Sequence, residues 1–225
     1  MKANAESLIE YLGGFISESK KQTIEKVLAN RTRFITVVLE DIYQPQNASA
    51  VIRTCDCFGI QDLHVIENTN EYTLNPNVAQ GSSKWVSIVR YNHSESNNTE
   101  ECLDTLENEG YRLYGTSPSR SDIEIDQIEF EHKMAFMFGT ELSGLSGMAR
   151  QRACHVVRIP MYGFTESFNL SVSVALCLQT LVKKMRFSAI NWQLSEQEKQ
   201  VIRLKWYRKS VKHAAILERF FFDGK

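Results

Sequence analysis

Two glycine-containing segments in the second half of the chain carry the residue types that a binding or catalytic site needs. Residues 138–144 read FGTELSG, and residues 158–171 read RIPMYGFTESFNLS. Gly139 and Gly144 are suited to close backbone approach or a positive φ, although an ordinary strand-to-helix turn has the same pattern. Glu141 favours a site, because a carboxylate at the mouth of a pocket must be solvated or paired.

Ser167 and Asn169 alternate with Phe168 directly before a mostly apolar helical pattern at residues 170–181. Hydroxyl and amide side chains at this place can cap the helix that follows. They can also line a pocket and orient a substrate. The two interpretations do not exclude each other.

Arg53 lies in a helical pattern at residues 48–58 that is otherwise half apolar. A guanidinium in such a helix needs an anionic partner. Asp56 could provide an ordinary salt bridge, and a substrate phosphate is the functional alternative. A guanidinium can donate two parallel hydrogen bonds to a phosphate, but it stays protonated at neutral pH and is a poor proton acceptor.

The elements around these residues begin with a strand, a helix and a second strand. A β-branched run at residues 34–39 has the length of a strand, and residues 62–66 form the next one. Between them, Pro45 precedes the N-cap candidate Asn47, and Gly59 is placed to end the helix. This succession predicts a βαβ unit.

Strands and helices continue to alternate along the chain, which predicts a mostly parallel sheet covered on both faces. Further strands are predicted at residues 111–115, 134–138 and 156–159, the last of them buried, with helices at 99–109 and shortly after Gly144. Residues 85–91 read as either an extended segment or a short strand. At the two ends, residues 3–29 read as two short helices divided at Gly13-Gly14, and residues 195–222 as one long helix with a Ser195/Glu198 capping box.

Three loops rich in small residues follow three of the predicted strands, at residues 115–118, 139–141 and 160–161. In parallel sheets, ligands bind outside the carboxyl ends of the strands. We therefore expect these three loops to meet in one pocket.

Residues 47–54, which read NASAVIRT, complete a set of three motifs with residues 138–146 and 158–171. The order and content of this set resemble the SPOUT (SpoU/TrmH-type) RNA 2'-O-methyltransferases over roughly residues 34–186. The resemblance implies an α/β-knot fold, with a deep C-terminal trefoil knot whose loops hold S-adenosylmethionine in a bent conformation. It also implies catalysis without a metal, and a homodimer in which the cofactor loops of one subunit lie beside the first-motif helix of its neighbour.

The resemblance also assigns roles to individual residues. Arg53 is expected to position a phosphate and to stabilise the developing alkoxide, while the identity of the general base stays open. The catalytic candidates are Asn47, Arg53, Glu141, Ser167 and Asn169. The cofactor-binding candidates are Thr116, Gly139, Glu141, Ile159, Met161, Phe168 and Leu170.

Composition describes an ordinary globular protein, with 225 residues, 43% hydrophobic and 24% charged. No apolar run reaches the roughly 18 residues that span a bilayer, and the N-terminus lacks a signal-peptide pattern, so we expect a cytoplasmic protein. The five cysteines include no CxxC pair, which makes Cys55-x-Cys57 a weak metal candidate and favours buried reduced thiols.

The net charge of −1 conceals a segregation of charge. Residues 94–131 contain eleven acidic and two basic side chains, whereas residues 203–213 contain five basic and no acidic ones. The basic segment is either a solvated helix face or a surface for a polyanion. The candidates for RNA contacts are Lys20, Lys21, Arg31, Arg33, Arg208, Lys209 and Lys212.

These observations predict a helical extension at residues 1–33, a SPOUT methyltransferase domain at 34–187 and a second helical extension at 188–225. The basic C-terminal helix is typical of the tRNA-specific TrmH branch, which methylates guanosine 18 in the D-loop. The alternatives are a ribosomal RNA 2'-O-methyltransferase and an RNA-binding protein that kept the fold without catalysis. A plain dinucleotide-binding domain is disfavoured because no GxGxxG or Walker-type loop is present.

Overall fold

The protein is described by a computed structural model that covers residues 5–79, 81–118 and 121–224. Two compact units form, one from Thr32 to Trp192 and one from the residues up to Arg31 together with those from Gln193 onward. Residues 3 and 4 of the predicted N-terminal helical segment lie outside the described residues. The predicted functional boundaries at 33/34 and 187/188 stay predictions.

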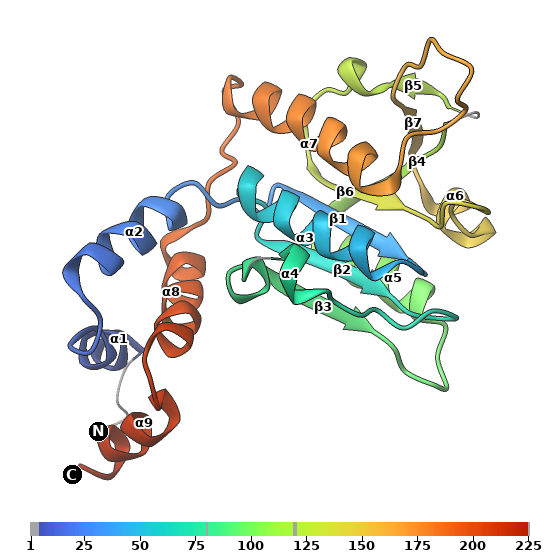
Figure 1. Cartoon of the computed structure of the whole chain (residues 1–225). Helices are drawn as coiled ribbons and strands as arrows, with labels where there is room; N and C mark the ends of the chain where they lie inside the picture. Colours follow the sequence, from blue (N-terminus) through green and yellow to red (C-terminus); the bar gives the residue numbers. More distant parts are fainter. Residues whose placement is uncertain (1–4, 80, 119–120, 225) are drawn as a thin grey trace. The chain divides into compact units, whose positions relative to one another are not determined.

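The larger unit is built on a seven-stranded sheet in which every pairing is parallel (Figure 1). The strand order is β3-β2-β1-β6-β4-β7-β5. The strands are β1 Ile35–Glu40, β2 Asp62–Ile66, β3 Ser87–Tyr91, β4 Tyr111–Thr116, β5 Ile123–Glu124, β6 Lys133–Phe138 and β7 His155–Arg158. The prediction of a parallel α/β sheet is thereby confirmed.

Helices cover both faces of this sheet. The covering helices are α3 Pro45–Phe58, α4 Pro76–Ala79, α5 Asn98–Asn108, α6 Gly147–Arg152 and α7 Leu170–Arg186, with short 3-10 turns at Ser82–Lys84 and Ile125–Gln127. One core joins alternate residues of β1, such as Val37, to α3 and α7. The other core places Val38 against α5 and α6. Because side chains alternate along a strand, residues 36, 38 and 40 of β1 share the α5/α6 face.

Helix α3 begins three residues earlier than the sequence predicts. Gln44 is its N-cap and Pro45 its first residue, so Asn47 lies inside the first turn and is buried. The prediction that Asn47 caps this helix is wrong, because proline at the first helical position needs no N–H and fixes a helical φ. Gly59 ends the helix with φ 78°, as predicted.

Strand β7 differs from the prediction of a buried strand. Val157 is its only buried residue, while His155 and Arg158 are exposed. It lies beside β5, a two-residue edge strand that sequence periodicity could not reveal. A strand so close to the sheet edge is covered over little of its length.

The second unit consists of α1 Ala5–Gly13, α2 Glu18–Leu28, α8 Glu196–Ser210 and α9 Ala214–Asp223. The division of the N-terminal segment and the Ser195/Glu198 capping box are confirmed. The prediction of a single helix over residues 195–222 is wrong. The chain breaks between α8 and α9 at His213, which adopts a left-handed φ of 59°.

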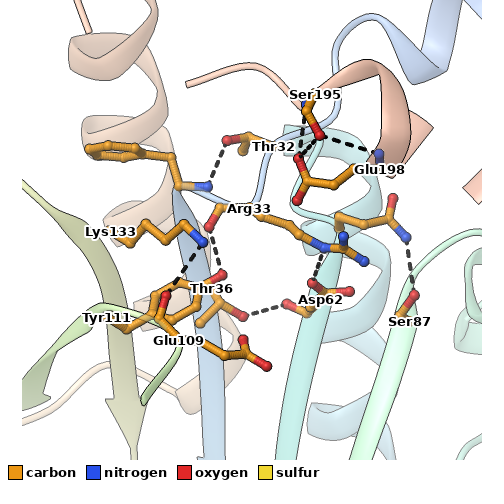
Figure 2. A network of polar contacts seen from close by, with 12 residues as sticks. Thr32, Arg33, Thr36, Asp62, Ser87, Glu109, Tyr111, Lys133, Ser195 and Glu198 are labelled. Atoms are coloured by element: carbon orange, nitrogen blue, oxygen red, sulfur yellow. Dashed lines mark hydrogen bonds and ion pairs between the residues drawn. The ribbon is translucent and has the colours of Figure 1, made fainter. Parts of the chain in front are cut away.

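A network of polar contacts occupies the amino-terminal edge of the sheet (Figure 2). Arg33 Nε donates to Asp62 Oδ2 over 2.6 Å, and Tyr111 Oη donates to the Arg33 carbonyl over 2.6 Å. Thr36 Oγ1 donates to the Asp62 carbonyl over 2.7 Å. This edge therefore joins β1, β2 and β4 by side-chain hydrogen bonds.

The cysteines divide into two groups. Cys55, Cys102 and Cys177 are buried thiols, as expected, but Cys57 and Cys154 are exposed. Within the described ranges, no group of three or more His, Cys, Asp or Glu side chains could hold a metal ion. The part of the chain that the structure describes also contains no helix long and apolar enough to cross a membrane.

Candidate active site

A cavity of about 500 Å³ opens at the carboxyl ends of β4, β6 and β7, which are neighbours in the sheet. Its walls come from the three loops that the sequence placed together, so that prediction is confirmed. Among the cofactor-binding candidates, the cavity is lined by Thr116, Gly139, Glu141, Ile159, Met161, Phe168 and Leu170. Of the catalytic candidates, Glu141, Ser167 and Asn169 also line it.

Gly139 is required by the way the loop after β6 folds back on itself. A Cβ at this position would lie 2.1 Å from the carbonyl carbon of Gly144. Gly144 has φ 68°, a value that side chains rarely tolerate. Between them, the loop is closed by the amides and carbonyls of Thr140 and Gly144, with N···O distances of 3.2 and 3.0 Å. Both glycines therefore shape the cavity wall.

Asn47 is the centre of a hydrogen-bond network that joins α3 to two of the cavity loops. Its Nδ2 donates to Glu141 Oε1 and, over 3.2 Å, to Gln44 Oε1. Its Oδ1 accepts from Asn169 Nδ2 over 3.0 Å. Asn47 is only 6% exposed, whereas Glu141 and Asn169 are exposed at the cavity. The network thus fixes two exposed polar groups through one buried amide.

Asn169 also caps the helix that follows it, as one of the two interpretations predicted. It is the N-cap of α7, and its Oδ1 accepts from the Ser171 amide over 2.9 Å and from Ser171 Oγ over 2.7 Å. One side chain therefore holds the helix start and faces the cavity. Ser167 is exposed and forms no hydrogen bond with any described residue.

The structure does not bring Arg53 to this cavity within one chain. Arg53 is exposed on α3 and is not among the lining residues. It lies six residues beyond Asn47, which corresponds to about 9 Å along the helix axis and a different face. The salt bridge to Asp56 does not form, and Arg53 has no hydrogen bond or ion pair with any residue in the described ranges.

Several lining residues were missed by the sequence analysis. Arg150 on α6 is a cation at the cavity, and Ser173 and Cys177 on α7 also line it. Arg150 and Ser173 could have been found by extending each motif by one turn into the helix that follows. Burial raises the pKa of the Cys177 thiol to about 12, so this residue contributes a thiol rather than a thiolate nucleophile.

The candidates for RNA contacts fall into different environments. Arg31 is fully buried with its guanidinium over the Trp206 ring, 5.3 Å from the centroid, so its assignment to RNA is corrected to a structural role. The Arg33 guanidinium donates a hydrogen bond to the Asp62 carboxylate, and the Arg208 guanidinium donates two hydrogen bonds to the Glu218 carboxylate. The lysines Lys20, Lys21, Lys209 and Lys212 are half-buried or exposed. Partial burial and the neighbouring Lys205 lower the pKa of Lys209.

Several known proteins are similar to this chain in sequence. A family model described as "SpoU rRNA Methylase family" matches residues 34–179. The chain is 45% identical to a tRNA (guanosine(18)-2'-O)-methyltransferase of Borreliella burgdorferi, over 93% of this chain and 94% of the relative. It is 30% identical to the enzyme of that name from Thermus thermophilus, over 72% of this chain and 81% of the relative.

Solved structures agree with the sequence relatives. The crystal structure of the A. aeolicus TrmH/SpoU tRNA modifying enzyme has a TM-score of 0.76 at 27% identity, over 87% of this chain and 98% of that chain. The methyltransferase AviRb in complex with AdoMet has a TM-score of 0.61 at 23% identity, which supports the fold alone. The family match covers more than half of the chain. The chain therefore belongs to the SpoU methylase family.

Proposed function

We propose that this protein transfers a methyl group from S-adenosylmethionine to the ribose 2'-hydroxyl of guanosine 18 in tRNA. The observation that carries the proposal is the cavity at the ends of β4, β6 and β7, where Glu141 and Asn169 are joined through Asn47. The near full-length similarity to a relative of that activity supports the choice of substrate.

The cavity fits a methyl donor of this kind. Its volume of about 500 Å³ lies within the roughly 300–1,000 Å³ of small-molecule sites. Apolar walls from Ile159, Met161 and Leu170 suit an adenine ring, while Arg150 and Glu141 suit the charged amino-acid end. When bound, the cofactor supplies a methyl group already activated on a sulfonium. The deep knot expected for the family stays part of this proposal.

The residues of the chain then have to hold the acceptor hydroxyl in line with that methyl group, since orientation provides much of the rate. Asn47 keeps Glu141 and Asn169 in fixed positions at the cavity. Ser167, which has no hydrogen-bond partner among the described residues, is free to bond the ribose. The residue that removes the hydroxyl proton stays open.

A homodimer would supply the missing arginine. Arg53 is exposed and does not line the cavity of its own chain. Apolar side chains next to the cavity, Tyr162, Phe164, Val172 and Leu176, are also exposed. We therefore propose that Arg53 of one subunit reaches the cavity of the other and binds a substrate phosphate with its two-pronged guanidinium.

Mixing two inactive variants tests this arrangement. Arg53→Ala lacks the arginine, and Gly139→Ala lacks a proper cavity loop. In a mixed dimer, one site combines the intact loop of the Arg53→Ala subunit with the arginine of the Gly139→Ala subunit. Mixing the two variants should therefore restore methyl transfer. If Arg53 acts within its own chain, or if the enzyme is a monomer, no activity returns. Arg53→Lys should stay poor, because an ammonium cannot reproduce the planar fork.

The helical unit should carry affinity for tRNA through its cations. Replacing Arg208, Lys209 and Lys212 by alanine should raise the Kd for tRNA and flatten its salt dependence, because fewer counterions are released. Cofactor affinity should not change. Glu218→Ala is the matched control, since it breaks the Arg208–Glu218 ion pair but keeps the cation. If the triple variant keeps the salt slope of the parent protein, this helix does not bind tRNA.

The substrate itself is settled by a labelling experiment. The protein is incubated with labelled S-adenosylmethionine and, separately, total tRNA and ribosomal RNA, and the methylated nucleotide is mapped. We expect label at guanosine 18 of tRNA. Label in ribosomal RNA instead would support the other activity that the name of the matched family suggests. Cofactor binding without transfer to either RNA would support a non-catalytic RNA-binding role.

A further inference from the structure

Glu40, the last residue of β1, is a buried carboxylate with an unusual set of partners. It is 3% exposed and lies on the sheet face that α5 and α6 cover. Its Oε1 accepts from Thr99 Oγ1 over 2.8 Å, and its Oε2 accepts from the Ser146 amide over 2.8 Å. Within the described ranges, these neutral donors are the only hydrogen-bond partners of the carboxylate, and no cation pairs with it.

Ser146 marks the point where the cavity loop ends. Leu145, directly before it, lines the cavity, and Arg150 lines it from the first turns of α6. Ser146 is the N-cap of α6, with its Oγ accepting from the Ala149 amide over 3.1 Å. Through the Ser146 amide, Glu40 therefore holds both the end of the loop and the start of the helix that carries Arg150.

The loop is thus attached by side chains at two places. At its tip, Glu141 is bonded to Asn47 of α3. At its end, Ser146 is bonded to Glu40 of β1. The bonds among Thr140, Ser143 and Gly144 stay inside the loop, so they shape the tip without fixing it to the sheet.

The partner of the other Glu40 carboxylate oxygen, Thr99, is also held by a further hydrogen bond. Thr99 Oγ1, which donates to Glu40, accepts in turn from Asn68 Nδ2 over 2.9 Å. The backbone amide of Asn68 donates to the carboxylate oxygen Oδ1 of Asp41 over 2.7 Å. Glu40 is consequently one link in a chain of hydrogen bonds that runs from the cavity loop to the loop after β2.

Burying a carboxylate against neutral donors costs free energy that an apolar side chain would not. Packing alone therefore does not account for glutamate at this position. We infer that Glu40 is a positioning residue that holds residues 139–147 in the shape that binds the methyl donor. The inference rests on the proposed function for the identity of that ligand, but not for the mechanical role of the carboxylate.

Glu40→Gln is the most informative change. An amide has one acceptor oxygen in place of two, and it accepts more weakly than a carboxylate. The backbone amide of Ser146 can only donate, so the single oxygen of glutamine must face either this amide or the Thr99 hydroxyl, and the contact that it keeps loses the charge of the carboxylate. The Kd for S-adenosylmethionine should rise about tenfold if a charge-assisted hydrogen bond is lost. Thr99→Val, which keeps the Ser146 contact, should have a smaller effect.

Glu67→Gln is the matched control. Glu67 is also a buried glutamate, and its carboxylate accepts from the Tyr72 amide and from Arg90. None of these partners lines the cavity. The control variant should lower the melting temperature while leaving the Kd for S-adenosylmethionine unchanged.

Amide hydrogen exchange provides a readout that does not depend on any ligand. In Glu40→Gln, the Ser146 amide and peptides from residues 139–147 should exchange faster, while peptides from α3 and β2 stay protected. Unchanged exchange there, or an increase no larger than in Glu67→Gln, overturns the inference. If Glu40→Gln does not fold, the same comparison is made with Glu40→Asp, whose shorter side chain keeps the charge but cannot reach both the Thr99 hydroxyl and the Ser146 amide. A parent protein that fails to bind S-adenosylmethionine refutes the proposed function and leaves the exchange result to decide on Glu40.

Discussion

The two edges of the sheet use polar side chains in different ways. At the amino-terminal edge, Arg33 and Asp62 bond to each other, and Tyr111 bonds to the Arg33 carbonyl (Figure 2). At the carboxyl edge, Glu141 and Ser167 are exposed at a cavity, and Ser167 has no hydrogen-bond partner in the described part of the chain.

This difference indicates that polar side chains at the amino-terminal edge mainly stabilise the fold, whereas those at the carboxyl edge mainly serve ligand binding. Polar groups that form hydrogen bonds with one another contribute to the folded state, and they have fewer donors and acceptors left for a ligand. Groups left with free donors or acceptors contribute little to stability and are available to a substrate. Arg33 illustrates the contrast, because this residue, which the sequence suggests for RNA contacts, forms an ion pair with Asp62 in the structure.

The largest effect is expected at the carboxyl edge from Gly139→Ala. The new Cβ would lie 2.1 Å from the Gly144 carbonyl carbon, so the loop has to move. We expect cofactor affinity to fall by about 100-fold or more, since displacements of about 1 Å have such effects in catalytic sites. Calorimetry measures the change. Gly147→Ala, where a Cβ meets nothing within 4 Å, is the control and should bind normally. Normal binding by both variants would show that the loop does not form the cofactor site.

Asn47→Ala should have the next largest effect. It removes the hydrogen bonds to Glu141 and Asn169, and we expect turnover to fall about 10- to 100-fold, mostly in kcat. Gln44→Ala, which removes only the exposed partner of the same amide, should remain near parent activity. Equal losses in the two variants would assign the effect to helix α3 as a whole rather than to the network.

Arg33→Ala and Asp62→Asn should have the smallest effect, confined to stability. Each breaks a partly buried ion pair, so we expect the free energy of unfolding to fall by about 1 kcal/mol. Turnover and tRNA affinity at a temperature where the variants are folded should match the parent. A loss of tRNA affinity in Arg33→Ala but not in Asp62→Asn would restore Arg33 as an RNA contact and weaken the contrast between the edges.

The sequence predicted the parts of the fold that local patterns determine. β1 and β6 are mostly apolar runs of strand length, and the three cavity loops follow from the rule for parallel sheets. Two-residue β5 is too short for any pattern, and the break at His213 contains no glycine or proline to mark it. Both depend on tertiary packing that periodicity does not contain.

Within the site, the sequence motifs predicted three of the polar residues, but they did not predict the hydrogen bonds that these residues form with one another. The motifs located Asn47, Glu141 and Asn169, but the bonds among them join residues 94 and 122 positions apart in the chain. The role of Glu40 is hidden in the same way, because in the sequence it is only the last residue of a strand. The burial of Arg31 against Trp206 also depends on packing between distant helices.

The cavity at the ends of β4, β6 and β7 has a consequence for protein synthesis. Its walls come from Thr116, from the loop after Phe138 and from the chain up to Cys177, so it cannot exist before that last segment leaves the ribosome. Strands β1 and β2 are made much earlier, yet β1 must wait for β6 to complete its pairing. The cofactor therefore cannot assist the first half of the chain to fold, and that half has to avoid aggregation without the help of the cofactor until the ribosome has synthesised the rest.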